Sequence, residues 1–412
     1  MVPKDWSHTH IKDILSSPVK NGFSPNAVEH ETGYVILGLG ALTDAGLRIE
    51  EIKCVELNES VVKSRLKSGD FLVSRSNTPD KVGRSALFRG EIENCSYPDL
   101  MMKFRVNKEL ADLNYIEAVL KSPAIRQYYK SCAAGSSSSM VKITKSVVEK
   151  TPLVLPSLKE QREIAKILSI WEKAICATEA LVDNSKQLKK ALMQQLLTGK
   201  KRLLNDNGIS FSGKWKEKKI ESLGLIYSGG TPSTSNKDYW DGGIDWVTPT
   251  DITKQDSIYI NSSKRKISKD GLKYSSAKLV PKGTLLICTR ATIGEMAITS
   301  HEMCTNQGFK NIVPNKSTSI EFIYYLLSYN KYKLISKSSG STFLELSKSS
   351  FESMQFEMPI IDEQQKIAAV LISADKDIEL HSQELSNLKE EKSALMQQLL
   401  TGKRRMKNKD IK

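Results

Sequence analysis

The residues best suited to chemistry in this 412-residue chain are arginines, lysines and amides in polar loops that follow predicted strands. Phe71-Leu72-Val73-Ser74 is predicted to be a strand, and the polar loop after it carries Arg75 and Arg84. A guanidinium can donate two hydrogen bonds to guanine and an amide can pair with adenine, while either can contact a phosphate oxygen. Base edges and phosphates are therefore the ligands that these side chains suit.

The same reasoning selects candidate DNA-binding residues in both halves of the chain. In the first half they are Arg75, Asn77, Lys81, Arg84 and Lys142. In the second half they are Ser228, Gly230, Thr231, Lys254, Arg290, Thr292, Gln307 and Lys310. Glycines 229 and 230 either let a nucleic-acid backbone approach closely or form an ordinary tight turn. For each polar candidate, base contact, phosphate contact and plain solvent exposure stay open.

Signatures of catalysis and of metal binding are missing from the sequence. Residues 208–214 match the first seven positions of a phosphate-binding loop, but Trp215 occupies the position that needs a hydroxyl for magnesium. The six cysteines show no ligand spacing, and His8 and His10 have no third ligand nearby. We therefore expect no catalytic residue, no metal site and no cofactor bound by this chain itself.

The composition indicates a polyanionic partner. The formal net charge is +14 and the sequence pI is about 9.2, values that favour nucleic acid as a ligand. An acidic membrane surface is the alternative, but no apolar run approaches the length of a membrane span. Scattered cysteines without a pairing pattern are typical of reduced thiols, so a cytoplasmic location is expected.

An internal repeat organises the chain. The residues Ala191–Lys200 return unchanged at Ala394–Lys403, an offset of 394 − 191 = 203. At this offset, residues 156–203 and 359–406 share 22 identities over 48 positions, so the repeat is a true duplication. Both copies have the periodicity of a long amphipathic helix that needs a partner in water, and the simplest partner is the other copy.

The apolar positions of these helices alternate in steps of three and four, which predicts a coiled-coil seam. The residues expected to pair the helices, or to dock a partner, are Leu168, Ile175, Leu192, Leu196, Leu371, Ile378, Leu395 and Leu399. Lys189 and Lys392 interrupt the seam, and polar seam residues restrict the register. Gly199 and Gly402 are predicted to end the helices in the left-handed conformation.

The predicted fold class is α+β (mixed α/β), with two recognition domains separated by two long antiparallel coiled-coil helices in a pseudo-twofold arrangement. Helices are expected over residues 115–129 and 322–334, and flexible serine-rich segments over 135–139 and 338–341. The expected domain boundaries are 1–155 for the first recognition domain, 156–202 for the first spacer helix, 203–357 for the second domain, and 358–412 for the second helix with a basic tail.

These features resemble the specificity (S) subunit of type I restriction-modification systems. One motif is the helix end Leu-Leu-Thr-Gly-Lys at 196–200 and 399–403, preceded by Pro156…Glu160-Gln161 and Pro359…Glu363-Gln364. The other opens the second domain, as Ser228-Gly229-Gly230-Thr231-Pro232-Ser233 followed by Ile244-Asp245-Trp246-Val247-Thr248-Pro249. The first domain lacks the Gly-Gly-Thr-Pro sequence, so the resemblance implies a different half-site for it.

The resemblance implies a non-catalytic subunit in which each recognition domain reads one half of a bipartite, asymmetric site in double-stranded DNA. The helices would set the spacer and dock two methyltransferase subunits, which bind S-adenosylmethionine. Restriction subunits that use ATP and magnesium would join that complex. The alternative is a stand-alone DNA-binding or architectural protein without a methyltransferase partner. A third interpretation is a pure interaction scaffold that binds no DNA at moderate salt.

Overall fold

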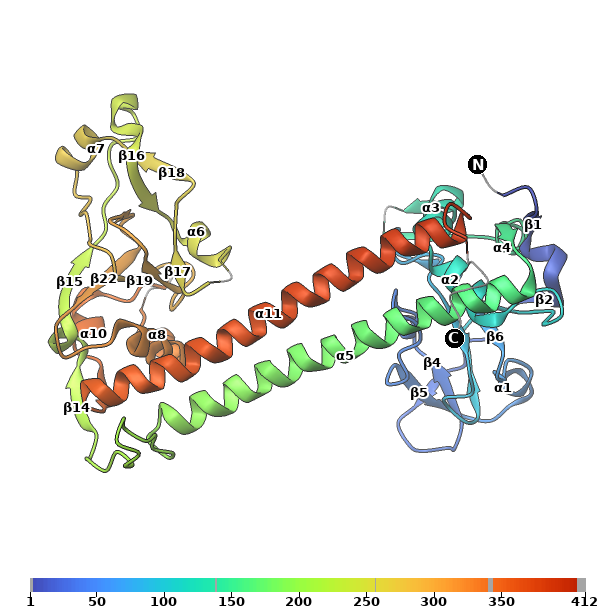
Figure 1. The fold of residues 1–412 in the computed structure, drawn as a ribbon, viewed down its shortest axis with the longest axis horizontal. Helices are drawn as coiled ribbons and strands as arrows, with labels where there is room; N and C mark the ends of the chain where they lie inside the picture. The colour runs from blue at the N-terminus through green and yellow to red at the C-terminus, as the bar shows by residue number, and fades with distance from the viewer. Residues whose placement is uncertain (1–2, 138, 256, 340–343, 406–412) are drawn as a thin grey trace. The chain divides into compact units, whose positions relative to one another are not determined.

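The computed structural model describes residues 3–137, 139–255, 257–339 and 344–405, and they form two compact units (Figure 1). Unit 1 comprises Met1–Glu179 and Glu384–Lys412, and unit 2 comprises Ala180–Gln383. Each unit joins one domain of mixed strands and short helices to part of both long helices. The predicted α+β class is confirmed.

Unit 1 contains four sheets, with strand orders β1-β13, β2-β10-β6-β8, β11-β12-β7 and β3-β5-β4-β9. Its strands are β1 Ser7–His10, β2 Leu15–Asn21, β3 Ala27–Val28, β4 Val35–Leu37, β5 Ile52–Val55, β6 Asp70–Ser74, β7 Ser76–Asn77, β8 Ser85–Phe88, β9 Cys95–Ser96, β10 Met101–Val106, β11 Ala134–Ser137, β12 Met140–Lys142 and β13 Pro152–Leu155. Its short helices are η1 Ile11–Ile14, η2 Leu39–Ala41, α1 Glu59–Lys63, α2 Leu113–Lys121, α3 Pro123–Cys132 and α4 Lys145–Glu149.

Unit 2 contains three sheets, with strand orders β14-β23, β15-β22-β19-β20-β17 and β18-β16-β21. Its strands are β14 Lys216–Lys219, β15 Gly224–Ser228, β16 Trp240–Val247, β17 Tyr259–Ile260, β18 Arg265–Ile267, β19 Leu285–Cys288, β20 Met296–Thr299, β21 Cys304–Thr305, β22 Phe309–Pro314 and β23 Gln355–Met358. Its short helices are η3 Ile220–Leu223, η4 Lys237–Tyr239, α6 Pro249–Thr253, α7 Lys269–Lys273, α8 Ile320–Tyr329, α9 Lys331–Ser336 and α10 Lys348–Glu352.

The two units repeat one topology. In each, a strand at the domain start pairs with the strand that precedes a long helix, as β1 with β13 and β14 with β23. The order β2-β10-β6-β8 in unit 1 matches β15-β22-β19-β20 in unit 2, and all of these neighbouring pairs are antiparallel. The sequence repeat therefore extends to the domains, whose sequences have diverged far more than the helices.

The long helices are α5 Leu158–Leu196 and α11 Ile361–Leu400. The predicted pairing residues lie on their buried or half-buried side: Leu168, Leu196, Leu371 and Leu399 are buried, and Ile175, Leu192, Ile378 and Leu395 are half-buried. Gly199 and Gly402 end the helices with φ of 66° and 69°, as predicted.

The lysines that interrupt the seam form ion pairs between the helices. In unit 1, Lys392 contacts Glu172 at 2.9 Å and Lys389 contacts Glu179 at 2.8 Å. In unit 2, Lys189 pairs with Asp375. As α5 numbers rise, α11 numbers fall, so the helices pack antiparallel. Because 392 − 203 = 189 and 375 − 203 = 172, the pairs of Lys189 and Lys392 are equivalent in the repeat.

Buried polar residues tie each helix start to its domain. Gln161 accepts a hydrogen bond from Asp112 N (2.8 Å) and donates to Pro156 O (2.9 Å). Its repeat equivalent, Gln364, accepts from Ser319 N (3.0 Å) and donates to Pro359 O (2.9 Å). A buried amide costs free energy unless such partners are present, so these bonds fix the direction in which each helix leaves its domain.

Three local predictions need correction. The helix predicted over 115–129 is two helices, α2 and α3, because Ser122 caps the second one and Pro123 cannot continue the first. The helix predicted over 322–334 is likewise divided, at Asn330. The segment predicted to be flexible at 135–139 includes β11, which pairs with β12. Residues 340–341 of the other serine-rich segment, and the tail beyond 405, lie outside the described residues.

Candidate DNA-recognition surfaces

In unit 1, the chain leaves β6 at one edge of the four-stranded sheet, where Ser74 pairs with Met101 of β10. Arg75 follows directly and its Nη1 donates to Asp99 O at 3.2 Å. The pairing of β12 with β7 places Lys142 opposite Ser76. The pairing of β7 with β12 therefore brings Arg75 and Lys142 to one basic edge, although they are 67 positions apart in sequence (142 − 75).

Two other candidates of this loop have internal roles. Asn77 is only 6% exposed; its amide donates to Ser74 Oγ (3.3 Å) and its carbonyl accepts from Thr78 N (2.9 Å), so it shapes the turn. Arg84 forms a bidentate ion pair with Asp44. Both side chains therefore have a structural role inside the unit, and their contact with DNA stays a prediction. Lys81 is exposed.

In unit 2, the corresponding edge is formed by the ends of β15 and β19 and the start of β22. Ser228 lies opposite Lys310, and Cys288 lies opposite Phe309. Just beyond these ends, Thr231 donates a hydrogen bond to Gln307, and Arg290 follows β19. The candidates Ser228, Thr231, Arg290, Gln307 and Lys310 are thus gathered at one edge, although the sequence spreads them over 83 positions (310 − 228 + 1).

The charges at this edge are partly neutralised. Arg290 Nη2 lies 2.9 Å from a carboxylate oxygen of Glu345, the repeat equivalent of Lys142 because 142 + 203 = 345. Lys310 is only 6% exposed, and burial lowers the pKa of its ammonium group, an effect that the charge of Glu345 opposes. Lys310 is therefore a buried charge beneath the edge, and its contact with DNA stays a prediction.

Glycines 229 and 230 make room for the chain's own backbone. A Cβ at Gly229 would lie 1.9 Å from Asn306 O, and one at Gly230 would lie 2.3 Å from the carbonyl carbon of Ser276. Gly230 O also accepts a hydrogen bond from Trp246 Nε1 at 2.8 Å. The Gly-Gly-Thr-Pro and Asp-Trp-Val-Thr-Pro motifs therefore pack against each other, and the approach of DNA to these glycines stays a prediction.

The other two candidates of unit 2 lie outside this edge cluster. Lys254 is exposed just after α6. Thr292 lies in the turn between β19 and β20, and its hydroxyl oxygen is buried.

A buried carboxylate stabilises the second motif. Asp245 Oδ1 accepts hydrogen bonds from Ser263 N (2.8 Å) and Oγ (3.0 Å), and Oδ2 lies 3.0 Å from His301 Nε2 and 3.3 Å from Lys266 Nζ. Burial would raise the pKa of this carboxyl, but these hydrogen bonds outweigh burial and hold the pKa below its ordinary value. Asp245 therefore stays charged and orders β16 against β18.

Sequence reasoning missed one surface group in unit 2. The guanidinium carbon of Arg265 lies 3.7 Å from the ring centroid of Trp240 and 5.1 Å from that of Trp246. The two tryptophan rings pack edge to face, with 5.0 Å between their centroids. The signal available in the sequence was the run Lys264-Arg265-Lys266 after a tryptophan-rich strand.

The described residues show no candidate metal cluster and no disulfide. No cluster of three or more His, Cys, Asp or Glu in this part of the chain could hold a metal ion. All six cysteines are free, and burial raises the pKa of Cys95, Cys288 and Cys304 to about 12. Within the same residues, no helix is both long and apolar enough to cross a bilayer.

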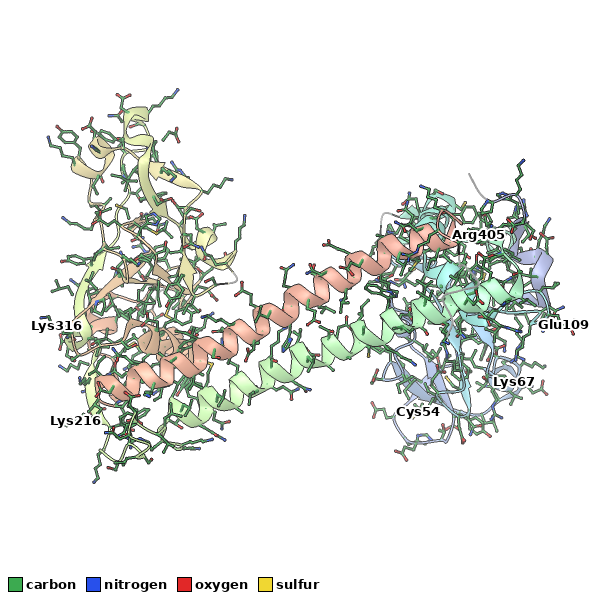
Figure 2. The ribbon with its side chains drawn as sticks, viewed as in Figure 1. Cys54, Lys67, Glu109, Lys216, Lys316 and Arg405 are labelled. Carbon is green, nitrogen blue, oxygen red and sulfur yellow. The ribbon has the colours of Figure 1, made fainter. Side chains whose placement is uncertain are left out.

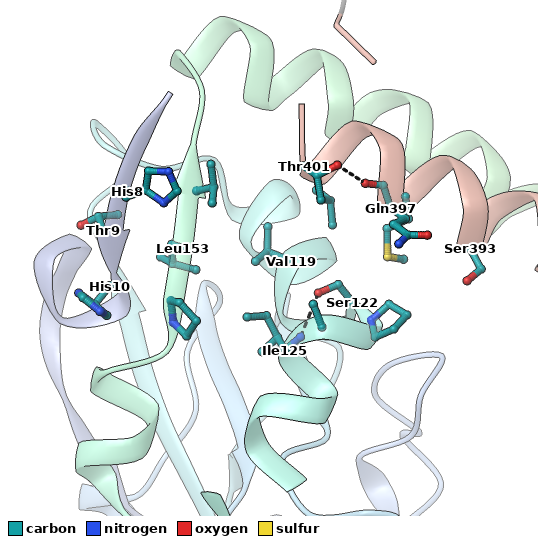
Figure 3. Close-up of a pocket in the computed structure, with 16 residues that line it drawn as sticks. His8, Thr9, His10, Val119, Ser122, Ile125, Leu153, Ser393, Gln397 and Thr401 are labelled. Carbon is teal, nitrogen blue, oxygen red and sulfur yellow. Dashed lines mark hydrogen bonds between the residues drawn. The ribbon is translucent and has the colours of Figure 1, made fainter. Parts of the chain in front are cut away.

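A mainly apolar cavity of about 650 Å³ lies in unit 1, where the end of α11 meets the domain (Figure 3). Met396, Leu400 and Thr401 line it from α11 and the turn after it, and Leu153 lines it from β13. Unit 2 has a smaller hollow of about 390 Å³ lined by Leu197, Thr198 and Phe356, among other residues. At the offset of 203, Leu197, Thr198 and Phe356 correspond to Leu400, Thr401 and Leu153. The two hollows are therefore repeat equivalents.

Known proteins similar to this chain share its whole layout. The chain is 27% identical over 430 aligned residues to the putative type I restriction enzyme MjaX specificity subunit of Methanocaldococcus jannaschii, covering 98% of this chain and 95% of the relative. It is 23% identical to the type I restriction enzyme HindI specificity subunit of Haemophilus influenzae, covering 97% and 99%. A 42% identity to the MjaIX specificity subunit of M. jannaschii covers 40% of this chain and 39% of that relative.

The fold is similar to that of the type I restriction-modification S subunit from M. genitalium, known from a crystal structure, with a TM-score of 0.60, 15% identity, and coverage of 97% of this chain and 99% of that one. The family model described as the type I restriction modification DNA specificity domain matches twice, at residues 3–184 and 212–390. The chain therefore belongs to the family of type I restriction-modification DNA specificity subunits, and it is a non-catalytic specificity subunit.

Proposed function

We propose that each unit reads one half of a bipartite site in double-stranded DNA, through the domains at residues 1–155 and 203–357. The helix segments at 156–202 and 358–412 would set the spacer between the half-sites. The candidate DNA contacts are Arg75, Asn77, Lys81, Arg84 and Lys142 in unit 1, and Ser228, Gly230, Thr231, Lys254, Arg290, Thr292, Gln307 and Lys310 in unit 2. Asn77, Gly230 and Lys310 are buried, and the others are exposed or half-buried.

One observation carries this proposal: equivalent edges of the same fold present different side chains. Unit 1 presents Arg75 and Lys142, whereas unit 2 places Glu345 at the position of Lys142 and pairs it with Arg290. Two copies of a fold with unlike edges suit two unlike half-sites, because sequence is read by the donors and acceptors that reach base edges. The net charge of +14 supports a polyanionic ligand.

The repeat also supports the number of protein partners. Equivalent hollows at the ends of α11 and α5 offer two related docking places, and we assign them to two copies of a methyltransferase subunit. That subunit would bind S-adenosylmethionine and methylate adenine, and restriction subunits that use ATP and magnesium would complete the complex. Because such a complex would act on chromosomal DNA, the location that we propose for the chain is the cytoplasm.

The test is to co-express the chain with its methyltransferase subunit and map adenine methylation on genomic DNA by single-molecule sequencing. A two-part motif with a fixed gap supports the proposal, and exchanging residues 1–155 for those of a relative should change only one half of the motif. A stable complex without methylation of such a motif argues against bipartite reading. If the chain does not bind the methyltransferase but binds DNA alone with a steep salt dependence, the stand-alone DNA-binding protein is the better description.

A substitution in the cavity of unit 1 tests whether the methyltransferase subunit docks there. Ala124 is exposed and lines the cavity of unit 1, so Ala124→Glu introduces a carboxylate there without disturbing the core. A carboxylate facing an apolar partner surface is costly to desolvate, so we expect less methyltransferase to co-purify. Ala27→Glu is the control, because Ala27 is exposed in β3, and neither β3 nor its partner β5 lines that cavity. Equal recovery with both variants would exclude this cavity as a docking place.

A further inference from the structure

The strands β16 and β18 and the helix α7 lie together in unit 2 (Figure 1). Residues 239–274, which contain them, are rich in aromatic and basic residues. Strand β18 pairs antiparallel with β16, which sets Arg265 opposite Trp246. The guanidinium of Arg265 rests on the face of Trp240, 3.7 Å from the ring centroid. Cation–π contact of this kind holds the guanidinium plane in one orientation while its edge stays exposed.

Both tryptophans are fixed by hydrogen bonds to the loop after β15. Trp240 Nε1 donates to Ser233 O at 3.1 Å, and Trp246 Nε1 donates to Gly230 O at 2.8 Å. This loop also contains Thr231, which bonds Gln307 at the proposed recognition edge. The platform under Arg265 is therefore continuous with that edge through three bonded contacts.

Arg265 is exposed, and no carboxylate among the described residues pairs with it. The neighbouring Lys266 differs, because it contacts the buried Asp245. An arginine whose side chain is already ordered, and whose donors face solvent, loses little conformational entropy when it binds an anion.

The surroundings have the same sign of charge. Residues 264–273 contain five basic side chains and one acidic one, a formal charge of 5 − 1 = +4. Lys264, Lys269 and Lys273 are exposed. Tyr274 is 60% exposed and stacks against Tyr239, with 6.3 Å between the ring centroids. Lys273 Nζ lies 5.1 Å from the centroid of the Tyr274 ring. Long basic side chains around one ordered guanidinium suit a run of phosphates rather than a single small anion.

We propose that Arg265, held on Trp240 and Trp246, contacts the phosphate backbone of duplex DNA beside the half-site read by unit 2. This contact rests on the proposed function. It positions the duplex against the edge at Thr231 and Gln307 and carries no sequence information of its own.

The test uses the full chain co-purified with its methyltransferase subunit and two labelled duplexes, one with the methylated motif and one with that motif scrambled. Fluorescence anisotropy gives the Kd of each duplex over a series of NaCl concentrations. For Arg265→Ala, a lost charge-assisted contact weakens binding of both duplexes by the same factor, roughly tenfold. The slope of log K against log salt falls by about one.

Three further variants complete the design. Arg265→Lys keeps the charge and should keep the salt slope, and Trp240→Leu removes the platform and should weaken binding of both duplexes. Lys316→Ala, beyond the opposite end of β22 (Figure 2), is the exposed-charge control and should leave both Kd and slope unchanged. Unaltered circular dichroism of each variant shows that the domain is folded.

Two results would overturn the assignment. Unchanged affinity and slope in Arg265→Ala would show that the residue does not contact DNA. A loss confined to the motif duplex would show that it reads a base instead of a phosphate. Failure of the proposed function is distinguishable from both, because the unmodified complex itself would then bind the two duplexes equally or not at all.

Discussion

The ion pair of Arg202 and Glu363 gives a quantitative prediction about how a domain is held to the helices. Arg202 Nε and Nη2 each lie 2.6 Å from a carboxylate oxygen of Glu363, and Nη1 donates to Gly213 O at 3.0 Å. The Glu363 side chain is 1% exposed, whereas that of Arg202 is 22% exposed. Removal of Arg202 therefore leaves a buried carboxylate, whereas removal of Glu363 leaves a guanidinium that is partly exposed to water.

Arg202→Met leaves a buried carboxylate without its cation, which costs about 3–5 kcal/mol of the free energy of unfolding. Glu363→Leu leaves a guanidinium that can turn to water, so we expect a smaller cost of about 1–3 kcal/mol. The double variant removes both charges and should be more stable than Arg202→Met alone, because an apolar pair can replace a buried ion pair at little cost.

Urea unfolding, followed by far-UV circular dichroism and tryptophan fluorescence, measures these differences. Trp215 is a local probe, because the guanidinium carbon of Arg202 lies 6.0 Å from its ring centroid. The control is Lys219→Met, which removes a 3.3 Å ion pair with Glu221 whose side chains are 52% and 53% exposed, and should cost less than about 1 kcal/mol. If Arg202→Met costs no more than this control, burial of the carboxylate does not govern the contact. If the two losses simply add in the double variant, the residues are not coupled.

Three further predictions concern unit 2. Gly230→Ala places a Cβ 2.3 Å from backbone and should lower the free energy of unfolding by at least about 1–3 kcal/mol in urea titrations. Gly243→Ala has open space and should stay within about 1 kcal/mol of the unmodified protein; equal effects would refute the steric argument. The pKa of Asp245 is lowered in the folded state, so the stability that this carboxylate contributes is present above the unfolded pKa near 3.9 and is lost as pH falls through the folded pKa. Asp245→Asn should therefore flatten the acid side of the curve of unfolding free energy against pH. An unchanged curve would contradict the role of this carboxylate. Glu345→Gln frees Arg290 from a half-exposed ion pair and should tighten DNA binding by at most about 1 kcal/mol in anisotropy titrations, whereas weaker binding would contradict the competition.

The helices were predictable because their rules are local. Steps of three and four identified the buried side of α5 and α11, and glycine after each helix end matched the left-handed φ values at Gly199 and Gly402. The exact repeat removed the ambiguity that a single copy would have left. Even the seam lysines were informative, since a polar residue at such a position needs a partner from the other helix, and Lys189 and Lys392 have one.

The candidate site was predictable only in its location on loops after strands. Whether a particular arginine is available depends on residues far away in the sequence: Asp44 binds Arg84 from 40 positions away, and Glu345 binds Arg290 from 55 positions away (345 − 290). Burial of Asn77 and Lys310 depends in the same way on packing by other strands. Loop composition therefore predicts a binding surface but does not predict which of its side chains face the ligand.

The repeat separates what is kept from what varies. Glu363 and Arg202 in unit 2 correspond to Glu160 and Arg405 in unit 1, where Arg405 Nε lies 2.8 Å from Glu160 Oε1 (Figure 2). The same offset relates Gln161 and Gln364, the glutamines that tie the starts of α5 and α11 to their domains. These contacts involve the ends of the long helices and the N-cap residues of α2 and α8, Asp112 and Ser319, and none involves the recognition edges. A domain can therefore change the side chains at its edge without losing the contacts that seat it on the helices, which is the physical condition for changing one half of a recognised sequence independently of the other.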